Sequence, residues 1–190
     1  MKILKWFLIL VALLALVFFG KGLLTSSVEY ECEVSVDKPV EEVWAVMSDT
    51  SRSGEWIEGY LRTEPISGDH GTVGAVSNIF VDNNGQELSM EETITELIPN
   101  EKIAMTFTID FMDMDYAMSV SEEGEGSKIT SYSKATGNGI FAKSMVAFMP
   151  SAMKKQENKN LGLLRDAIEN NTKDYGLGEE NETADTAAVE

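Results

Sequence analysis

A strand that runs directly into a helix at a proline is the feature that most constrains the fold of this chain. Between Val28 and Val36, apolar residues alternate with glutamates and a serine, which predicts a strand with one buried and one solvated face. Asp37 is the expected N-cap of the following helix, and Pro39 suits the first helical turn. The helix should bury an apolar stripe of Val40, Val43, Trp44 and Met47.

The rest of the chain predicts an antiparallel sheet followed by one long helix. A second short helix is expected at residues 51–56, and strands at 59–66, 74–81, 86–98, 102–111, 114–121 and 128–136. Short turns join these strands, including an Asn-Gly turn at 82–85 that accepts positive φ. Short connections of this kind indicate antiparallel pairing. The long helix should run from Ile140 to about Asn170, with Pro150 kinking or splitting it near Met149.

The long helix is expected to be amphipathic. Its apolar stripe would contain Met145, Met149, Met153, Leu161, Leu164 and Ile168. Its opposite, solvated face would carry Lys154, Lys155, Glu157 and Lys159.

This order of elements resembles the START-like superfamily, also called SRPBCC, which contains polyketide cyclases/dehydrases and lipid-transport proteins. The resemblance covers residues 28–170, and the residues that carry it are Val36, Pro39, Glu42, Val43 and Trp44, followed by Asp49 and Trp56. It implies an α+β helix-grip fold, in which a curved antiparallel sheet wraps around the C-terminal helix and leaves a cavity. Pro150 departs from the simplest members of that group and bears on the size of the cavity.

The first 24 residues predict a membrane anchor. Trp6–Phe19 is an unbroken apolar run, and Ile3–Leu24 approaches the roughly 20 residues that a bilayer requires. A cleaved signal peptide is the alternative, but no Ala-x-Ala site follows the run. Lys2 and Lys5 outnumber Lys21, so the positive-inside rule predicts an extracytoplasmic domain. We therefore expect an anchor at 1–24, a START-like domain at 25–172 and a disordered acidic tail at 173–190.

Charge and residue inventory argue against several classes of function. A net charge of -17 disfavours nucleic acid, since phosphate binding requires clustered Lys and Arg, and it also disfavours docking on anionic lipid head groups. One histidine, His70, and one cysteine, Cys32, cannot make a metal site or a convincing catalytic triad. Cys32 lies on the apolar face of the first strand and is expected to be a small buried hydrophobe. The sequence predicts no catalytic residue, metal ligand or cofactor.

Two polar residues are candidates for contact with a ligand inside the sheet. Glu92 shares strand parity with Met90 and Ile94, so it should point inward, where burial would raise the pKa of its carboxyl. The alternatives are a bulge that turns Glu92 to water, or a position at the sheet edge. Tyr116 is also inward by parity and could offer its hydroxyl to a ligand, or be a core tyrosine.

The remaining candidates are apolar. Trp56 could form the lip of a binding cavity or belong to the core. The methionines expected on inner faces and assigned to ligand binding are Met90, Met105, Met118 and Met149. Methionine is flexible and polarisable, so these side chains could line a cavity for variable apolar ligands or fill gaps in an imperfect core.

These patterns together predict a membrane-tethered domain that binds a hydrophobic small molecule or lipid between the sheet and the C-terminal helix. One alternative is a cyclase- or dehydratase-like enzyme, which would need an acid/base pair in the cavity. The other is a filled-core domain whose acidic surface binds a basic protein. An enzyme is the less favoured interpretation, because the sequence offers no histidine at the predicted cavity.

Overall fold

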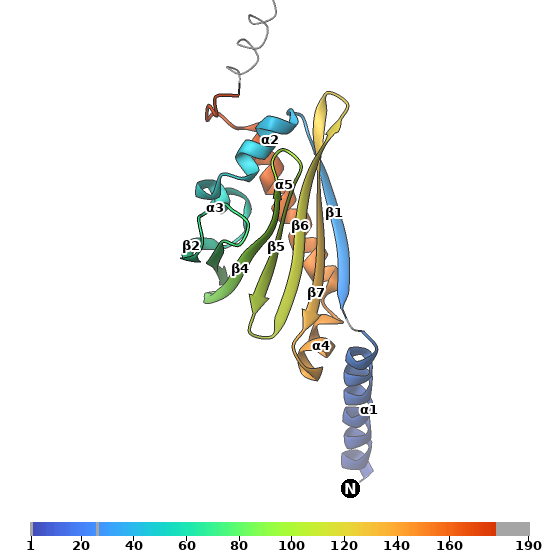
Figure 1. Cartoon of the computed structure of the whole chain (residues 1–190). Helices are drawn as coiled ribbons and strands as arrows, with labels where there is room; N and C mark the ends of the chain where they lie inside the picture. Colours follow the sequence, from blue (N-terminus) through green and yellow to red (C-terminus); the bar gives the residue numbers. More distant parts are fainter. Residues whose placement is uncertain (1, 26, 178–190) are drawn as a thin grey trace, which may run out of the picture.

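The computed structural model describes residues 2–25 and 27–177, and it has the predicted α+β organisation (Figure 1). The helices are α1 (Lys2–Leu24), α2 (Val40–Met47), α3 (Ser53–Trp56), α4 (Ile140–Val146) and α5 (Pro150–Glu169), with a 3-10 turn at Thr50–Arg52. The strands are β1 (Val28–Val36), β2 (Tyr60–Ser67), β3 (Val76–Asn83), β4 (Gln86–Ile98), β5 (Lys102–Ile109), β6 (Met112–Glu123) and β7 (Gly126–Gly137).

The seven strands form one antiparallel sheet in the order β1-β7-β6-β5-β4-β3-β2. β1 is an edge strand that pairs with β7, with Val28 opposite Ala135 and Val36 opposite Ser127. The sheet curves, and α5 crosses its concave face, where it packs on β1, α2 and α3 (Figure 1). The helix-grip fold expected from the sequence is therefore confirmed.

Two apolar clusters lie between the sheet and its helices, whereas the two best-defined hollows of the described residues are on the surface, on α1 and where β1 meets α5, and not at the expected cavity. The α2-side core consists of Cys32, Val36, Val43, Val46, Met47, Met118, Val120, Ile129, Leu161, Leu164 and Ile168. The α4-side core consists of Val28, Ile109, Met112, Ala135 and Val146. Tyr30 packs against both clusters. The interior is thus divided along α5 into two apolar ends.

The strand-to-helix junction differs in detail from the sequence expectation. Pro39, in an extended conformation, occupies the N-cap position of α2, so Asp37 is not the cap. The chain bends at residues 37–38 before the helix begins, and the Ser127 hydroxyl donates to the Lys38 carbonyl over 2.7 Å across this bend. The chain uses residues 37–38 to turn out of the sheet, so the helix begins after Asp37. Asp49 caps the 3-10 turn at Thr50–Arg52, where its side chain accepts a hydrogen bond from the Ser51 amide.

Pro150 splits the C-terminal helical region, as predicted. α4 ends at Val146, and Pro150 is in the first turn of α5, where its missing N–H leaves no helical hydrogen bond unmade. α4 packs on β7 and on α1, whereas α5 continues across the sheet. The gripping helix therefore begins only at Pro150, and α4 becomes a separate element.

The domain's ordered contacts extend past residue 172. The Tyr175 hydroxyl donates to a carboxylate oxygen of Asp49 over 3.0 Å, and the Lys173 ammonium lies 2.6 Å from the same oxygen. Tyr175 also packs against the α2-side core. The expected tail boundary at 173 therefore falls before these contacts, and residues 178–190 of the expected tail lie outside the described part of the chain.

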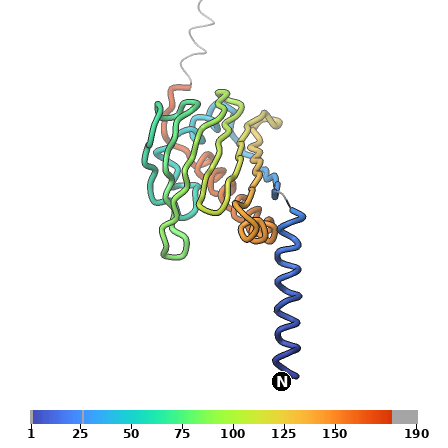
Figure 2. The backbone as a smooth tube through the Cα atoms, turned by 60° about the horizontal axis from the view of Figure 1, so that its bottom comes forward, coloured from blue at the N-terminus to red at the C-terminus, as the bar shows by residue number. Residues whose placement is uncertain are grey.

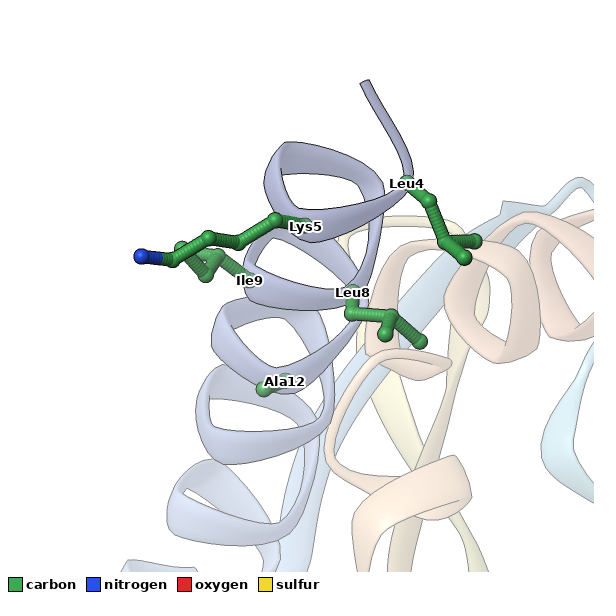
Figure 3. A pocket seen from close by; sticks show the side chains of 5 residues that line it. All are labelled: Leu4, Lys5, Leu8, Ile9 and Ala12. Atoms are coloured by element: carbon green, nitrogen blue, oxygen red, sulfur yellow. The ribbon is translucent and has the colours of Figure 1, made fainter. Parts of the chain in front are cut away.

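α1 projects from the α4 end of the domain as one continuous helix (Figure 2). Its 23 residues are long and apolar enough to cross a membrane, by length and composition. A shallow groove on its surface is lined by Leu4, Lys5, Leu8, Ile9 and Ala12 (Figure 3). All five belong to one helix and no second element faces them, so this groove is a helix surface and not a candidate binding site.

Candidate functional site

Glu92 occupies the inward position that strand parity predicted. It pairs with Ser77 of β3 and with Phe107 of β5, so it lies on a central strand. The bulge in β4 falls between Ile94 and Glu96, beyond Glu92, and does not turn it outward. Burial raises the pKa of the Glu92 carboxyl above its ordinary value. Both alternatives considered for this residue, a bulge before it and an edge strand, are therefore wrong.

Tyr116 is the centre of a buried polar contact on the same inner face. It lies opposite Met105 of β5 and Ser133 of β7, and its ring packs edge-on against Phe107 with 5.9 Å between centroids. Its hydroxyl donates to a carboxylate oxygen of Glu157 over 2.9 Å. Burial raises the pKa of the Tyr116 phenol well above its usual range, and the neighbouring Glu157 raises it further.

Glu157 is the site residue that the sequence analysis placed on the wrong face of α5. Only 9% of it is exposed, and Tyr116 supplies its hydrogen bond within the described residues. It stands one turn after Met153, which packs on the α4-side core, and one turn before Leu161 of the α2-side core. That i, i+4 spacing was a signal for an inward position. Because Glu157 is charged and lies among three lysines, the sequence predicted a position on the solvated face.

Two buried serines adjoin the Tyr116–Glu157 pair, and each lies beside a tyrosine hydroxyl, Ser133 beside Tyr30 and Ser131 beside Tyr116. Ser131 and Ser133 of β7 are each 1% exposed, and neither hydroxyl makes a well-formed hydrogen bond. Ser133 lies opposite both Tyr30 and Tyr116 in the sheet. We call Tyr30, Tyr116, Ser131, Ser133 and Glu157 the polar band. It separates the two apolar cores, and its two serines make the inner face of β7 as polar in sequence as the outer face.

The other predicted ligand-binding residues lie at several places in the interior. Met105 lies beside Tyr116, and Met90 packs on the α4-side core. Met118 is fully buried in the α2-side core, which Trp56 flanks. The indole N–H of Trp56 is buried without a partner.

Met149 lies apart from this group, at the N-cap of α5. Met153, one turn later, contacts the α4-side core instead. The structure thus brings Glu92, Met105, Tyr116 and Phe107 together and leaves Met149 at the edge.

A surface hollow approaches the polar band from the β1 edge. It has a volume of about 340 Å³ and is lined by Glu31, Cys32, Glu33, Lys154 and Asn158, where β1 meets α5. The Cys32 thiol is 3.8 Å from the Lys154 carbonyl, and Cys32 pairs with Ser131 of the polar band. One residue layer therefore separates this hollow from the buried serines.

The arrangement can donate and accept hydrogen bonds within an apolar interior. The described residues hold no cluster of His, Cys, Asp and Glu suited to a metal ion. The polar band contains a carboxyl, two phenols and two hydroxyls, which match a ligand that carries one or two polar groups. Such an arrangement can hydrogen-bond a polar group of a largely apolar molecule.

The raised pKa of Glu92 predicts a pH-dependent contribution to stability. The folded state binds the Glu92 proton more tightly than the unfolded chain does, so this contribution is fully present below the ordinary pKa of 4.5 and is lost as pH rises through the folded value. Glu92→Gln removes the titration and keeps the shape. Its stability relative to wild type should therefore rise between about pH 4 and about pH 7.5.

Thermal unfolding of the detergent-solubilised chain across this pH range measures the effect. Glu91→Gln is the matched control, since Glu91 is the exposed neighbour on the same strand. The same pH response in both variants would place the Glu92 carboxyl in water.

One family model matches this chain, and several solved structures are similar to it. Residues 27–169 match the family model described as polyketide cyclase / dehydrase and lipid transport. The crystal structure of TTHA0849 from Thermus thermophilus is similar, with a TM-score of 0.62 at 15% identity over 74% of this chain and 97% of that chain. CV1439 from Chromobacterium violaceum has a TM-score of 0.59 at 17% identity, covering 75% and 98%. No curated protein matches the sequence significantly.

A third similar structure is larger than the domain described here. The di-domain ARO/CYC StfQ from the steffimycin biosynthetic pathway has a TM-score of 0.63 at 13% identity. The match covers 75% of this chain and 51% of that one. At these identities the structural likeness shows the fold alone.

Proposed function

We propose, because the chain belongs to the polyketide cyclase / dehydrase and lipid transport family, that its domain binds a hydrophobic small molecule or lipid between the sheet and α5. In this proposal α1 tethers the domain to a membrane. The chemical class of the ligand is inferred from the side chains on the concave face, and the tether from the length and composition of α1.

The observation that carries the proposal is the pair of buried hydroxyls on Ser131 and Ser133, neither of which makes a well-formed hydrogen bond within the chain. A buried polar group without a partner costs about 1–3 kcal/mol, so nearly all such groups in folded proteins are satisfied. Two of them on one face of β7, next to the Tyr116–Glu157 hydrogen bond and beside the Tyr30 and Tyr116 hydroxyls, leave hydrogen-bonding capacity for a further polar group. A polar group of a bound ligand would satisfy them.

The surroundings of the polar band indicate that the rest of the ligand is apolar. Met105, Phe107 and Ile94 lie on the same face of neighbouring strands. They are flanked by the partly buried Met90 and Met114, which pack on the α4-side core. Contact with such side chains would stabilise the complex by about 25 cal/mol per Å² of apolar surface buried. Flexible methionines would allow ligands of somewhat different shape.

Tyr116 is suited to a binding role in this proposal. An enzyme of the cyclase or dehydratase type needs a residue that gives or takes a proton near neutral pH. The pKa of the Tyr116 phenol is raised well above its usual range, which makes this residue a poor acid at neutral pH. It acts instead as a fixed hydrogen-bond donor to Glu157.

The tether would hold this site where apolar ligands concentrate. Lys2 and Lys5 precede the apolar run and Lys21 ends it, so the positive-inside rule places the domain outside the cytoplasm. Thr25 and Ser27 are the only described residues between α1 and β1, so the domain would stay close to the bilayer.

Native mass spectrometry of the full chain tests the ligand proposal. The chain is purified in a maltoside detergent, incubated with a total lipid extract and released from micelles in the spectrometer. We expect an added mass that disappears on denaturation. Ser131→Ala combined with Ser133→Ala should weaken binding about thirtyfold, since two hydrogen bonds of about 1 kcal/mol each would be lost.

Ser121→Ala is the control for this experiment, because Ser121 is exposed on β6. It should leave the occupancy unchanged. An unliganded mass at all lipid concentrations, for wild type and both variants, would contradict the binding proposal.

A further inference from the structure

α4 presents large apolar side chains to the outside of the molecule. Phe141 is 64% exposed, Ile140 is 43% exposed, and Phe148, just after the helix, is 51% exposed. The opposite side of α4 is buried against the domain, where Ala142 and Val146 are nearly inaccessible. Phe141, Phe148 and Ile140 form what we call the α4 patch. Three such residues on seven-residue α4 and its immediate C-terminal flank are far more than a soluble surface needs.

The α4 patch is continuous with the end of α1. The Phe18 ring stacks on Phe148 with 5.9 Å between centroids and 3° between planes, and it lies 5.7 Å from Phe141. The Lys21 ammonium lies 4.2 Å from the centre of the Phe148 ring. Gly22 is buried against Ser144, where a Cβ would clash. These contacts place the α4 patch at the level of the last turns of α1, and Figures 1 and 2 show α4 beside that end of α1.

The charge pattern around α4 differs from that of the rest of the chain. The chain has 32 acidic residues, yet the stretch from 126 to 156 contains none and carries Lys128, Lys134, Lys143, Lys154 and Lys155. The β5–β6 hairpin is the acidic neighbour, because Asn138 donates to the Phe111 carbonyl and so holds Asp110 and Asp113 nearby. α4 itself can thus approach lipid head groups without desolvating a carboxylate, although the whole chain is strongly acidic.

We infer that the α4 patch inserts into the membrane–water interface beside α1, so that the domain docks on the bilayer through a fixed face. The inference rests on the membrane tether of the proposed function. Aromatic side chains on a short amphipathic helix are suited to the boundary between head groups and acyl chains, at a depth of about 5–10 Å. The partner is the lipid bilayer, and Lys21 and Lys143 lie at head-group level.

Docking through α4 orients the interior of the domain toward the lipid. Val146 of α4 belongs to the α4-side core, and Met153 at the start of α5 packs against that core. The apolar end of the ligand region is therefore the end nearest the bilayer, and the polar band lies farther away.

Fluorescence quenching by brominated lipids tests the inference on the full chain. The chain is reconstituted in phosphatidylcholine vesicles whose acyl chains carry bromine near the head groups. Native Trp6 reports insertion of α1. In a Trp6→Phe background, Phe141→Trp adds an indole to the α4 patch, and Leu61→Trp adds one to β2, where Leu61 is 48% exposed.

We expect brominated lipid to lower the emission added by Phe141→Trp about threefold and to leave that added by Leu61→Trp unchanged. Quenching of Trp6 without quenching of the Phe141→Trp indole would overturn the α4 inference and leave the tether standing. Failure to quench Trp6 would overturn both. A dimer that is lost in Phe141→Ser/Phe148→Ser, together with no quenching at position 141, would assign the α4 patch to a second copy and so overturn the inference. This experiment does not measure ligand occupancy. A failure of the binding proposal would appear in the mass spectra and would leave the quenching unchanged.

Discussion

Replacing Leu164 by alanine should lower the free energy of unfolding by about 3 kcal/mol, within the range for a large-to-small change in a packed core. Leu164 is 0% exposed and lies in the α2-side core. It belongs to the face of α5 that the sheet grips, so the removed methyl groups would leave a cavity between helix and sheet. The loss should appear in urea-induced unfolding of the detergent-solubilised chain.

The neighbouring leucine provides the matched control for this substitution. Leu163 is half-buried and lies outside both apolar cores. Leu163→Ala should cost less than about 1 kcal/mol, because a partly exposed side chain has less contact to lose. Trp44 and Trp56 flank the α2-side core, so tryptophan fluorescence reports its unfolding directly. Equal losses for the two leucines would mean that α5 grips the sheet through another face.

The fold was predictable because its local signals agree with one another. β1 and β4 have the predicted bounds, and Asn84 and Gly85 have positive φ in the turn predicted from Asn-Gly. Pro150 divides the helical region at the expected place. Alternation, turn chemistry and proline position each depend on nearby residues only, so a single sequence contains them.

The candidate site was less predictable because its polar residues serve no local purpose. Ser131 and Ser133 make β7 look solvated, yet both hydroxyls are buried and make no well-formed hydrogen bond. Glu157 follows the apolar spacing of α5, but its charge favoured the solvent face. What places these residues inside is pairing with distant strands, through Tyr30 and Tyr116. Glu92 and Tyr116 were found because the alternation of their own strands is strong.

The middle turn of α5 is polar on its inner face, whereas the turns on either side are apolar. Its middle turn carries Glu157, whereas Met153 and Leu161 on either side contact the two apolar cores. A polar group at the centre of a helix that otherwise buries apolar side chains lowers stability unless it is satisfied. The hydrogen bonds that Glu157 and its neighbours can make therefore explain why a glutamate occupies this buried position.

Replacing Glu157 by alanine should lower the free energy of unfolding by about 2 kcal/mol, since the buried Tyr116 hydroxyl would lose its acceptor. Tyr116→Phe should cost a similar amount, because it removes the hydrogen-bond donor of a carboxyl that is 9% exposed. The double variant should cost less than the sum of the single variants by about 1–2 kcal/mol, since neither orphaned group then remains. Unfolding in urea, with occupancy by native mass spectrometry on the same samples, measures both consequences.

The double-mutant cycle also separates a structural role of this pair from a role in binding. Glu157→Gln keeps an acceptor for Tyr116, so it should restore most of the stability lost in Glu157→Ala. If a polar group of the ligand contacts the carboxylate, occupancy in Glu157→Gln should still fall by about tenfold, because hydrogen bonds to charged groups are the stronger ones. Ser151→Ala, an exposed change in the first turn of α5, should alter neither quantity. Additive effects in the cycle would show that Tyr116 and Glu157 act independently, and the polar band would then not be the recognition element of this domain.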